Sequence, residues 1–166
     1  ATSSYTTNTI CNSLRAIAVG AYDASLPERP ATRFSSRGPT ADGRQKPELV
    51  APGYRIRAAR SMPSHGWQPG ESQVTVKSGT SMASPHVAGT VALMYQAAGR
   101  PLTIGEVRRV LIGTADPHAG PPGRSSTRLG YGYLDIERAV SAVRGLGHDS
   151  TVTVPAPAVE DRGWDA

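Results

Sequence analysis

One long stretch with helical periodicity constrains the fold of this chain most strongly. It begins just after Ser81 and runs to about Ala98, with alanines interleaved among its larger apolar residues: Met82, Val87, Val91, Leu93, Met94 and Tyr95. Because the stretch is apolar nearly all round, it predicts a helix buried inside a domain. Pro85 is expected in the first turn, where its missing N–H costs little, and Gly99 is expected to cap the C-terminal end.

Short apolar segments before this helix predict four β-strands. Residues 15–22 and 49–51 form apolar runs of the length of buried strands, and a Pro-Gly turn follows the second. Residues 54–59 and 73–77 alternate apolar and polar side chains, which is typical of half-exposed strands. Within the last of these segments, Val74 and Val76 are expected on one face.

Two shorter helices are expected after the long one. Thr103 and Glu106 have the spacing of a capping box and predict a helix over residues 104–112. Its core face is expected to consist of Val107, Val110 and Leu111. Asp135 is a favourable N-cap for a further helix, which should end near Val143.

The alternation of strands and helices favours an α/β fold with a mainly parallel sheet. The set of elements is unbalanced, however. A buried helix needs packing partners on every side, and two further helices with a few short strands do not surround it. We therefore expect the sequence to be part of a larger domain.

Composition argues against several classes of function. The net charge is +5, but the 18 basic residues are scattered along the chain and aromatic residues make up only 5%, so we expect no nucleic-acid partner. No apolar run approaches the ~20 residues that span a bilayer. Cys11 is the only cysteine, which excludes an internal disulfide, and residues 1–12 lack the pattern of a signal peptide.

Ser81 occupies the junction between a strand-like segment and the long helix. The first N–H groups of a helix have no internal partners and carry the positive end of its dipole, so they can stabilise the oxyanion of an acyl-transfer reaction. Gly79 allows a substrate to approach the chain closely. The alternative is that Ser81 is only the helix N-cap, because serine is a preferred capping residue.

A longer match favours the nucleophile. Residues 79–89, Gly-Thr-Ser-Met-Ala-Ser-Pro-His-Val-Ala-Gly, resemble the serine motif of the subtilisin-like protease family. Three further segments resemble that family in the same order along the chain: residues 34–39, 42–53 and 130–135. The resemblance implies that Ser81 is the nucleophile and that its backbone N–H is one oxyanion donor. It also implies that the Thr80 side chain gives support nearby.

The same resemblance implies the architecture. The chain is expected to form the C-terminal portion of a three-layer α/β fold, with a mainly parallel sheet and a buried central helix that starts at the nucleophile. Residues 1–14 are expected to be an irregular N-terminal segment and residues 15–144 a partial peptidase domain. Residues 145–166 are expected to be a tail or linker, since periodicity fades after Gly145.

The chain departs from the family in its other catalytic motifs. It has no Asp-Thr/Ser-Gly motif, no His-Gly-Thr motif and no asparagine after Asn12 to serve as the second oxyanion donor. Asp42, His65 and Ser81 occur in the family's Asp–His–Ser order, but the intervals are too short to hold the intervening strands and helices. His86 lies about 140° around the helix from Ser81 and is expected to be structural.

These observations predict a serine endopeptidase that cleaves polypeptide substrates through an acyl-enzyme on Ser81 and is inactive as this chain alone. Its missing partner is expected to be the N-terminal part of the same domain. The alternatives are a non-catalytic pseudoprotease or interaction module, and assembly with another chain that provides the Asp and His. The resemblance implies secretion, with any export signal upstream. Calcium is common in relatives, but the residues before Arg15 match poorly, so no metal or cofactor is assigned.

Overall fold

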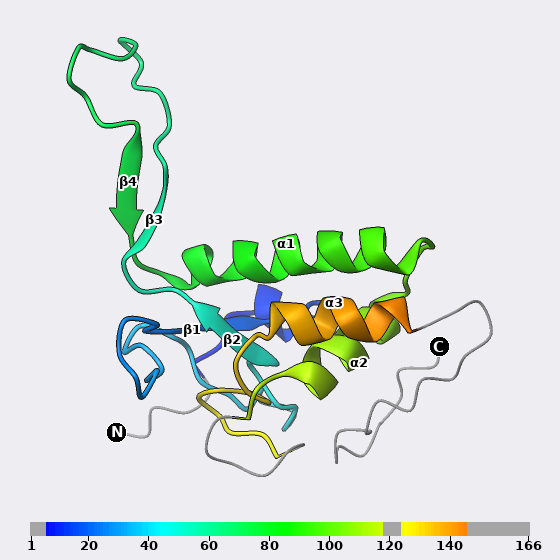
Figure 1. Ribbon diagram of the computed structural model, residues 1–166. Coiled ribbons are helices and arrows are strands. Elements are labelled where there is room, and N and C mark those ends of the chain that lie inside the picture. Colours follow the sequence, from blue (N-terminus) through cyan, green and yellow to red (C-terminus); the bar gives the residue numbers. More distant parts are fainter. Residues whose placement is uncertain (1–5, 118–123, 146–166) are drawn as a thin grey trace.

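The computed structural model describes residues 6–117 and 124–145, and Figure 1 shows their arrangement. A short 3-10 helix, Ile10–Asn12, is followed by four strands and three helices. The strands are β1 (Val19–Tyr22), β2 (Leu49–Pro52), β3 (Ile56–Ala59) and β4 (Val74–Lys77). The helices are α1 (Thr80–Ala98), α2 (Ile104–Thr114) and α3 (Ile136–Arg144). All four predicted strands and all three predicted helices are therefore present.

Strands β1 and β2 form a parallel pair in which Val19 lies opposite Leu49 and Tyr22 lies opposite Pro52. A segment near Tyr133 extends this pair on the other side of β2. Its neighbours bond to Val50, whose N–H donates to the Gly132 carbonyl at 2.9 Å and whose carbonyl accepts from the Leu134 N–H at 2.8 Å. The sequence analysis described this segment only as leading into α3, so its pairing with β2 is a new finding.

The alternation of side chains along β2 divides the packing between two faces. Leu49 and Ala51 belong to the main core, together with buried residues of all three helices. Val50 points to the opposite face, where it packs with Tyr22 and Tyr133. All three helices consequently cover the same face of the β1–β2 pair. Along that face, α1 packs against both strands and against α3.

Helix α1 is buried along one side only, which corrects the expectation of a fully buried helix. Its buried residues follow helical spacing: Ala83, Val87, Thr90 and Met94. Outside this buried stripe, Leu93 and Tyr95 are 47% and 43% exposed. Figure 1 shows one side of α1 lying over the sheet and α3, and its opposite side facing away from them. Pro85 is the sixth residue of the helix and not part of its first turn, so the expectation for its position was wrong.

The shorter helices begin as expected. The Thr103 side chain accepts from the Glu106 N–H while the Glu106 carboxylate accepts from the Thr103 N–H, which completes the capping box of α2. Asp135 caps α3 by accepting from the Arg138 N–H at 2.9 Å. Gly99 closes α1 in the left-handed conformation, with a φ of 63°. Across the described residues, none of the helices combines the length and apolar character that a membrane crossing requires.

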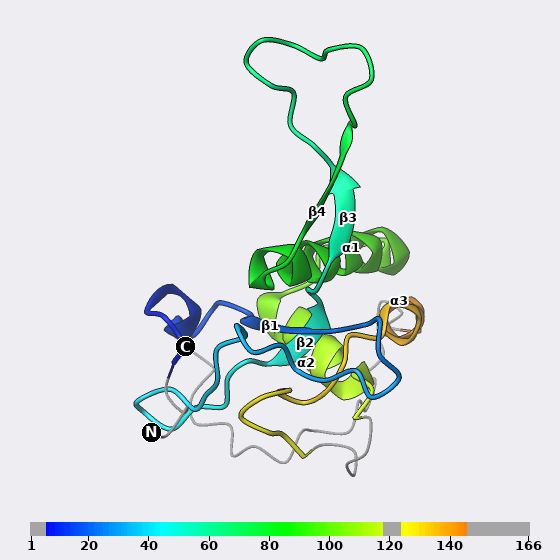
Figure 2. The same ribbon diagram turned by 90° about the vertical axis from the view of Figure 1, so that its left-hand side faces the viewer.

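Strands β3 and β4 form an antiparallel hairpin that projects from the body of the molecule in both views (Figures 1 and 2). Its base is closed by the Arg55 N–H, which donates to the Ser78 hydroxyl at 2.8 Å. Val74 and Val76 share a face as expected, but both are exposed, at 37% and 55%. The hairpin follows β2 directly and leads into α1, so it connects the sheet to the helix that carries Ser81.

A largely buried group of charges connects the segment before β2, which carries Lys46 and Glu48, with the segment before β1 and with α2. Lys46 is 2% exposed and donates to the Glu48 carboxylate at 2.5 Å. Arg108 donates to the same carboxylate oxygen at 2.8 Å. The second oxygen of Glu48 accepts from the Ala18 N–H at 2.8 Å. Burial is the main reason that the pKa of Lys46 is lowered, although Glu48 opposes the shift.

Candidate active site

The start of α1 is held against the carboxyl ends of the parallel strands. The Gly53 N–H, just past β2, donates to the carbonyl of Tyr22 at the end of β1 at 3.0 Å. The Gly53 carbonyl in turn accepts from the Gly79 N–H at 2.8 Å. Ser81 follows two residues later. It therefore lies at the edge of the sheet where open α/β folds bind their ligands.

Ser81 is the second residue of α1, and its side chain does not cap the helix. The N-cap is Gly79, which makes no side-chain cap bond. Ser81 itself is exposed, and among residues 6–117 and 124–145 its hydroxyl has no hydrogen-bond partner. Ser81 is therefore not the N-cap of α1. Its hydroxyl is free to meet a ligand beside the N–H groups of the first helical turn.

Gly53 is the residue that permits this close approach. A Cβ added at Gly53 would lie 2.5 Å from the Ala21 Cβ and 2.9 Å from the Gly79 carbonyl oxygen. Only a glycine fits between β1 and the segment that enters α1. The position of Ser81 thus depends on a residue 28 positions earlier in the sequence.

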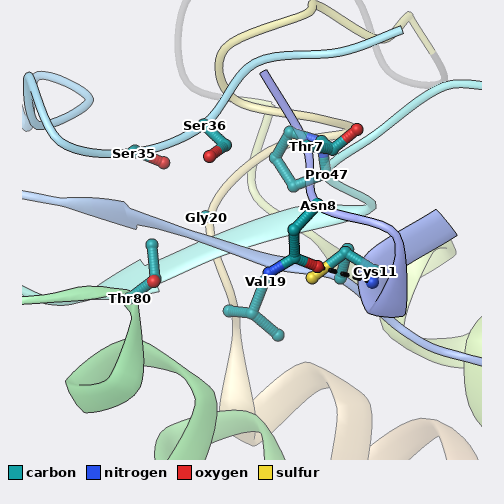
Figure 3. Close-up of a pocket in the computed structure, with 10 residues that line it drawn as sticks. Thr7, Asn8, Cys11, Val19, Gly20, Ser35, Ser36, Pro47 and Thr80 are labelled. Atoms are coloured by element: carbon teal, nitrogen blue, oxygen red, sulfur yellow. Dashed lines mark hydrogen bonds between the residues drawn. The ribbon is translucent and has the colours of Figure 1, made fainter. Parts of the chain in front are cut away.

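The two neighbours of Ser81 line two different pockets. Thr80 is directed toward β1 and lines a pocket of about 80 Å³, which Figure 3 shows between β1, the loop at Ser35–Ser36 and the N-terminal segment. Met82 lines a larger pocket of about 390 Å³ under the β3–β4 hairpin. Ser81 therefore lies in the chain between two residues that line separate pockets.

The histidines of the described chain do not serve as a base for Ser81. The His86 ring nitrogen Nδ1 bonds to the Met82 carbonyl at 2.9 Å on the same helix, in agreement with its expected structural role. His65 lies in the loop at the far end of the hairpin and is 3.9 Å from Glu71. Asp42 is paired with Arg44 at 2.8 Å, so Asp42, His65 and Ser81 are not assembled. His118 and His148 lie outside the described residues.

Among the residues that the structure describes, no group of three or more histidine, cysteine or acidic side chains could hold a metal ion. Cys11 is partly buried beside Asn8, whose side-chain oxygen accepts from the Cys11 N–H at 2.9 Å. The arrangement as a whole offers a serine hydroxyl, backbone donors and two pockets, which is suited to acyl transfer once a base is present.

Sequence reasoning missed the pocket beside Met82. Its cationic members, Arg60 and Lys77, lie on opposite strands of the hairpin or just beyond. A signal for it was available, since residues at alternate positions of 54–59 and 73–77 must share a face once the two strands pair. The register that brings Lys77 opposite Ile56 could not be read from either strand alone.

Comparison with known proteins identifies relatives. The family model described as "Subtilase family" matches residues 1–132. The chain is 38% identical over 117 residues to Bacillopeptidase F of Bacillus subtilis, a match that covers 69% of this chain and 8% of that protein. It is 40% identical over 111 residues to the serine protease AprX of the same organism, covering 61% of this chain and 25% of AprX.

Solved structures give the same assignment. The structure of the CspB protease of Clostridium perfringens superimposes with a TM-score of 0.67 and 26% sequence identity, over 84% of this chain and 29% of that one. The mixed helices and strands described above are accordingly part of a subtilisin-like α/β fold. The chain spans no more than a third of each of these three proteins.

Proposed function

Because this chain belongs to the subtilase family, we propose that it carries the nucleophile of a subtilisin-like serine endopeptidase, with Ser81 forming the acyl-enzyme. The observation that carries the proposal is the position of Ser81. It is exposed in the second position of α1, inside an eleven-residue serine motif, at the carboxyl ends of β1 and β2. A hydroxyl that caps no helix and is exposed to solvent is suited to attack a bound carbonyl.

The reaction follows from these groups. The Ser81 oxygen attacks the carbonyl carbon of the substrate peptide bond while a base takes the hydroxyl proton. Negative charge then develops on the carbonyl oxygen, and the backbone N–H of Ser81 is one donor that stabilises it. The base returns the proton to the leaving amine, and water hydrolyses the acyl-enzyme in a second round of the same steps.

The base and the group that orients it are expected from polypeptide outside this sequence. The chain has neither the Asp-Thr/Ser-Gly nor the His-Gly-Thr motif, and its described histidines are engaged elsewhere. In subtilisin itself, loss of the serine or the histidine lowers kcat about 10⁶-fold. We therefore expect these 166 residues alone to show no proteolysis.

The exposed side of α1 supports the same view. Leu93 and Tyr95 are large apolar residues that α1 exposes to solvent, and burial of exposed apolar surface favours association. We propose that the N-terminal part of the same catalytic domain covers it. Secretion is proposed because relatives include an extracellular basic protease of Dichelobacter nodosus.

A chimera tests this function. The part of AprX upstream of the region that matches this chain is joined to residues 1–166, and hydrolysis of casein is measured. We expect activity in the chimera, none with Ser81→Ala, and full activity with Ser84→Ala, an exposed serine one turn further along α1. A folded chimera whose activity survives Ser81→Ala would contradict the proposal, and a folded but inactive chimera would favour a non-catalytic module.

A further inference from the structure

The pocket beside Met82 is lined by apolar residues and by two cationic ones. We call it the hairpin pocket; it is lined by Ile56, Ala58, Ala59, Arg60, Ser61, Thr75, Lys77 and Met82. Its volume is about 390 Å³, enough for one or two side chains of a peptide. Its lining contains two cations and no acidic residue.

The hairpin register explains why Ile56, Ala58, Thr75 and Lys77 share one face. Lys77 pairs with Ile56, and Thr75 pairs with Ala58, so their side chains project to the same side of the two strands. The intervening pair, Arg57 with Val76, projects to the other side and does not line the pocket. The face with Lys77 is the one turned toward Met82 at the start of α1.

The two cations that line the hairpin pocket, Lys77 and Arg60, form no ion pair with the described part of the protein. Lys77 has no carboxylate within ion-pair distance among residues 6–117 and 124–145. Arg60 lies over the Trp67 ring, 5.6 Å from its centre, an arrangement that leaves its charge intact. The acidic residue of the same hairpin loop, Glu71, is directed to His65 at 3.9 Å.

We propose that the hairpin pocket binds an acidic side chain of the polypeptide held at Ser81, with Lys77 and Arg60 as the residues that select it. This inference rests on the proposed function, because Met82 places the pocket directly beside the nucleophile. The apolar lining residues can accommodate the methylene groups of a glutamate, and Lys77 and Arg60 can attract its carboxylate. The substrate class is therefore a polypeptide with an acidic residue close to the cleaved bond.

The test measures binding and needs no catalysis. The full 166-residue chain with Ser81→Ala is labelled with ¹⁵N and titrated with the peptide Ala-Ala-Leu-Glu-Ala-Ala and with its Gln and Lys counterparts. We expect the Glu peptide to bind at least about fivefold more tightly than the Gln peptide. Amide shifts are expected to concentrate in residues 56–61, 75–77 and at Met82.

Charge-reversal variants separate a site from general attraction. Lys77→Glu and Arg60→Glu should each remove the preference for the Glu peptide. Arg57→Glu makes the same change of net charge on the opposite face of β3 and should retain the preference. Dispersed amide spectra of all variants confirm that they are folded.

Four outcomes overturn the inference: equal binding of the Glu and Gln peptides, no binding of either, shifts located away from the hairpin pocket, or an equal loss with Arg57→Glu. Tighter binding of a hexathymidine oligonucleotide at the same residues would also overturn it, in favour of a nucleic acid. Since the Ser81 hydroxyl is absent from this experiment, its result is independent of whether Ser81 is the nucleophile.

Discussion

Gly79 donates its backbone N–H to the carbonyl oxygen of Gly53 at 2.8 Å, and this bond joins the start of α1 to the end of β2. It places Ser81 at the edge of the parallel strands. The two backbone segments are so close that no side chain fits at Gly53, since an added Cβ would lie 2.9 Å from the Gly79 carbonyl oxygen.

Gly53→Ala is therefore expected to lower the free energy of unfolding by about 1–3 kcal/mol, because the new methyl group collides with Ala21 and Gly79. Urea denaturation followed by circular dichroism measures the change. Gly89→Ala is the matched control, because Gly89 is helical and nothing lies within 4 Å of its added Cβ. It should stabilise α1 by about 0.5–1 kcal/mol. Equal effects of the two substitutions would show that the approach at Gly53 is not tight.

Glu48→Gln should be among the most destabilising polar substitutions. It removes the negative charge that faces the buried Lys46 and the largely buried Arg108. We expect a loss of about 3 kcal/mol in the free energy of unfolding. The same acid-to-amide change at Asp42, whose carboxylate is 61% exposed beside Arg44, should move the urea midpoint far less. A small effect at Glu48 would contradict the buried ion pairs.

The capping box of α2 predicts a pH dependence. Arg100, followed by the Thr103 N–H, lowers the pKa of Glu106 from 4.5 to about 2. Because the folded-state pKa lies below the unfolded value, its stabilisation is complete above pH 4.5 and is lost as the pH falls toward 2. Wild type should exceed Glu106→Gln by about 0.5 kcal/mol at pH 7, allowing for solvent screening, and the gap should close by pH 2.

Urea midpoints of both proteins at pH 7, 4.5, 3 and 2 measure this gap. Glu137→Gln provides the control, since it makes the same change in the first turn of α3, where Glu137 has no ion pair with any described residue. A gap for Glu106→Gln that is constant with pH would disprove the role of its ionised carboxylate.

Local patterns in the sequence predicted the elements that local interactions specify. The capping residues Thr103 and Asp135 located the starts of α2 and α3, and Gly99 located the end of α1, because each acts within a few residues of the chain. Arrangements between distant segments were not predictable. The pairing of β2 with the segment at Tyr133 and the hydrogen bond from Gly79 to Gly53 both depend on register between separate parts of the chain.

The burial of individual side chains was also not predictable from the sequence. The apolar periphery of α1 predicted a fully buried helix, yet Leu93 and Tyr95 are 47% and 43% exposed among the described residues. For the site, the motif around Ser81 located the candidate nucleophile and the structure gave its exposure. The proposed domain boundaries at residues 14 and 144 remain predictions.

The most direct measurement of the central proposal is to map a fluorophosphonate adduct by mass spectrometry. The AprX chimera and the 166-residue chain alone are each treated with the probe, digested and sequenced. We expect one adduct in the chimera, on Ser81, and none in the chain alone, where neither described histidine is placed to act as a base for this hydroxyl. An adduct on another serine of the chimera, or Ser81 labelling in the isolated chain, would contradict it.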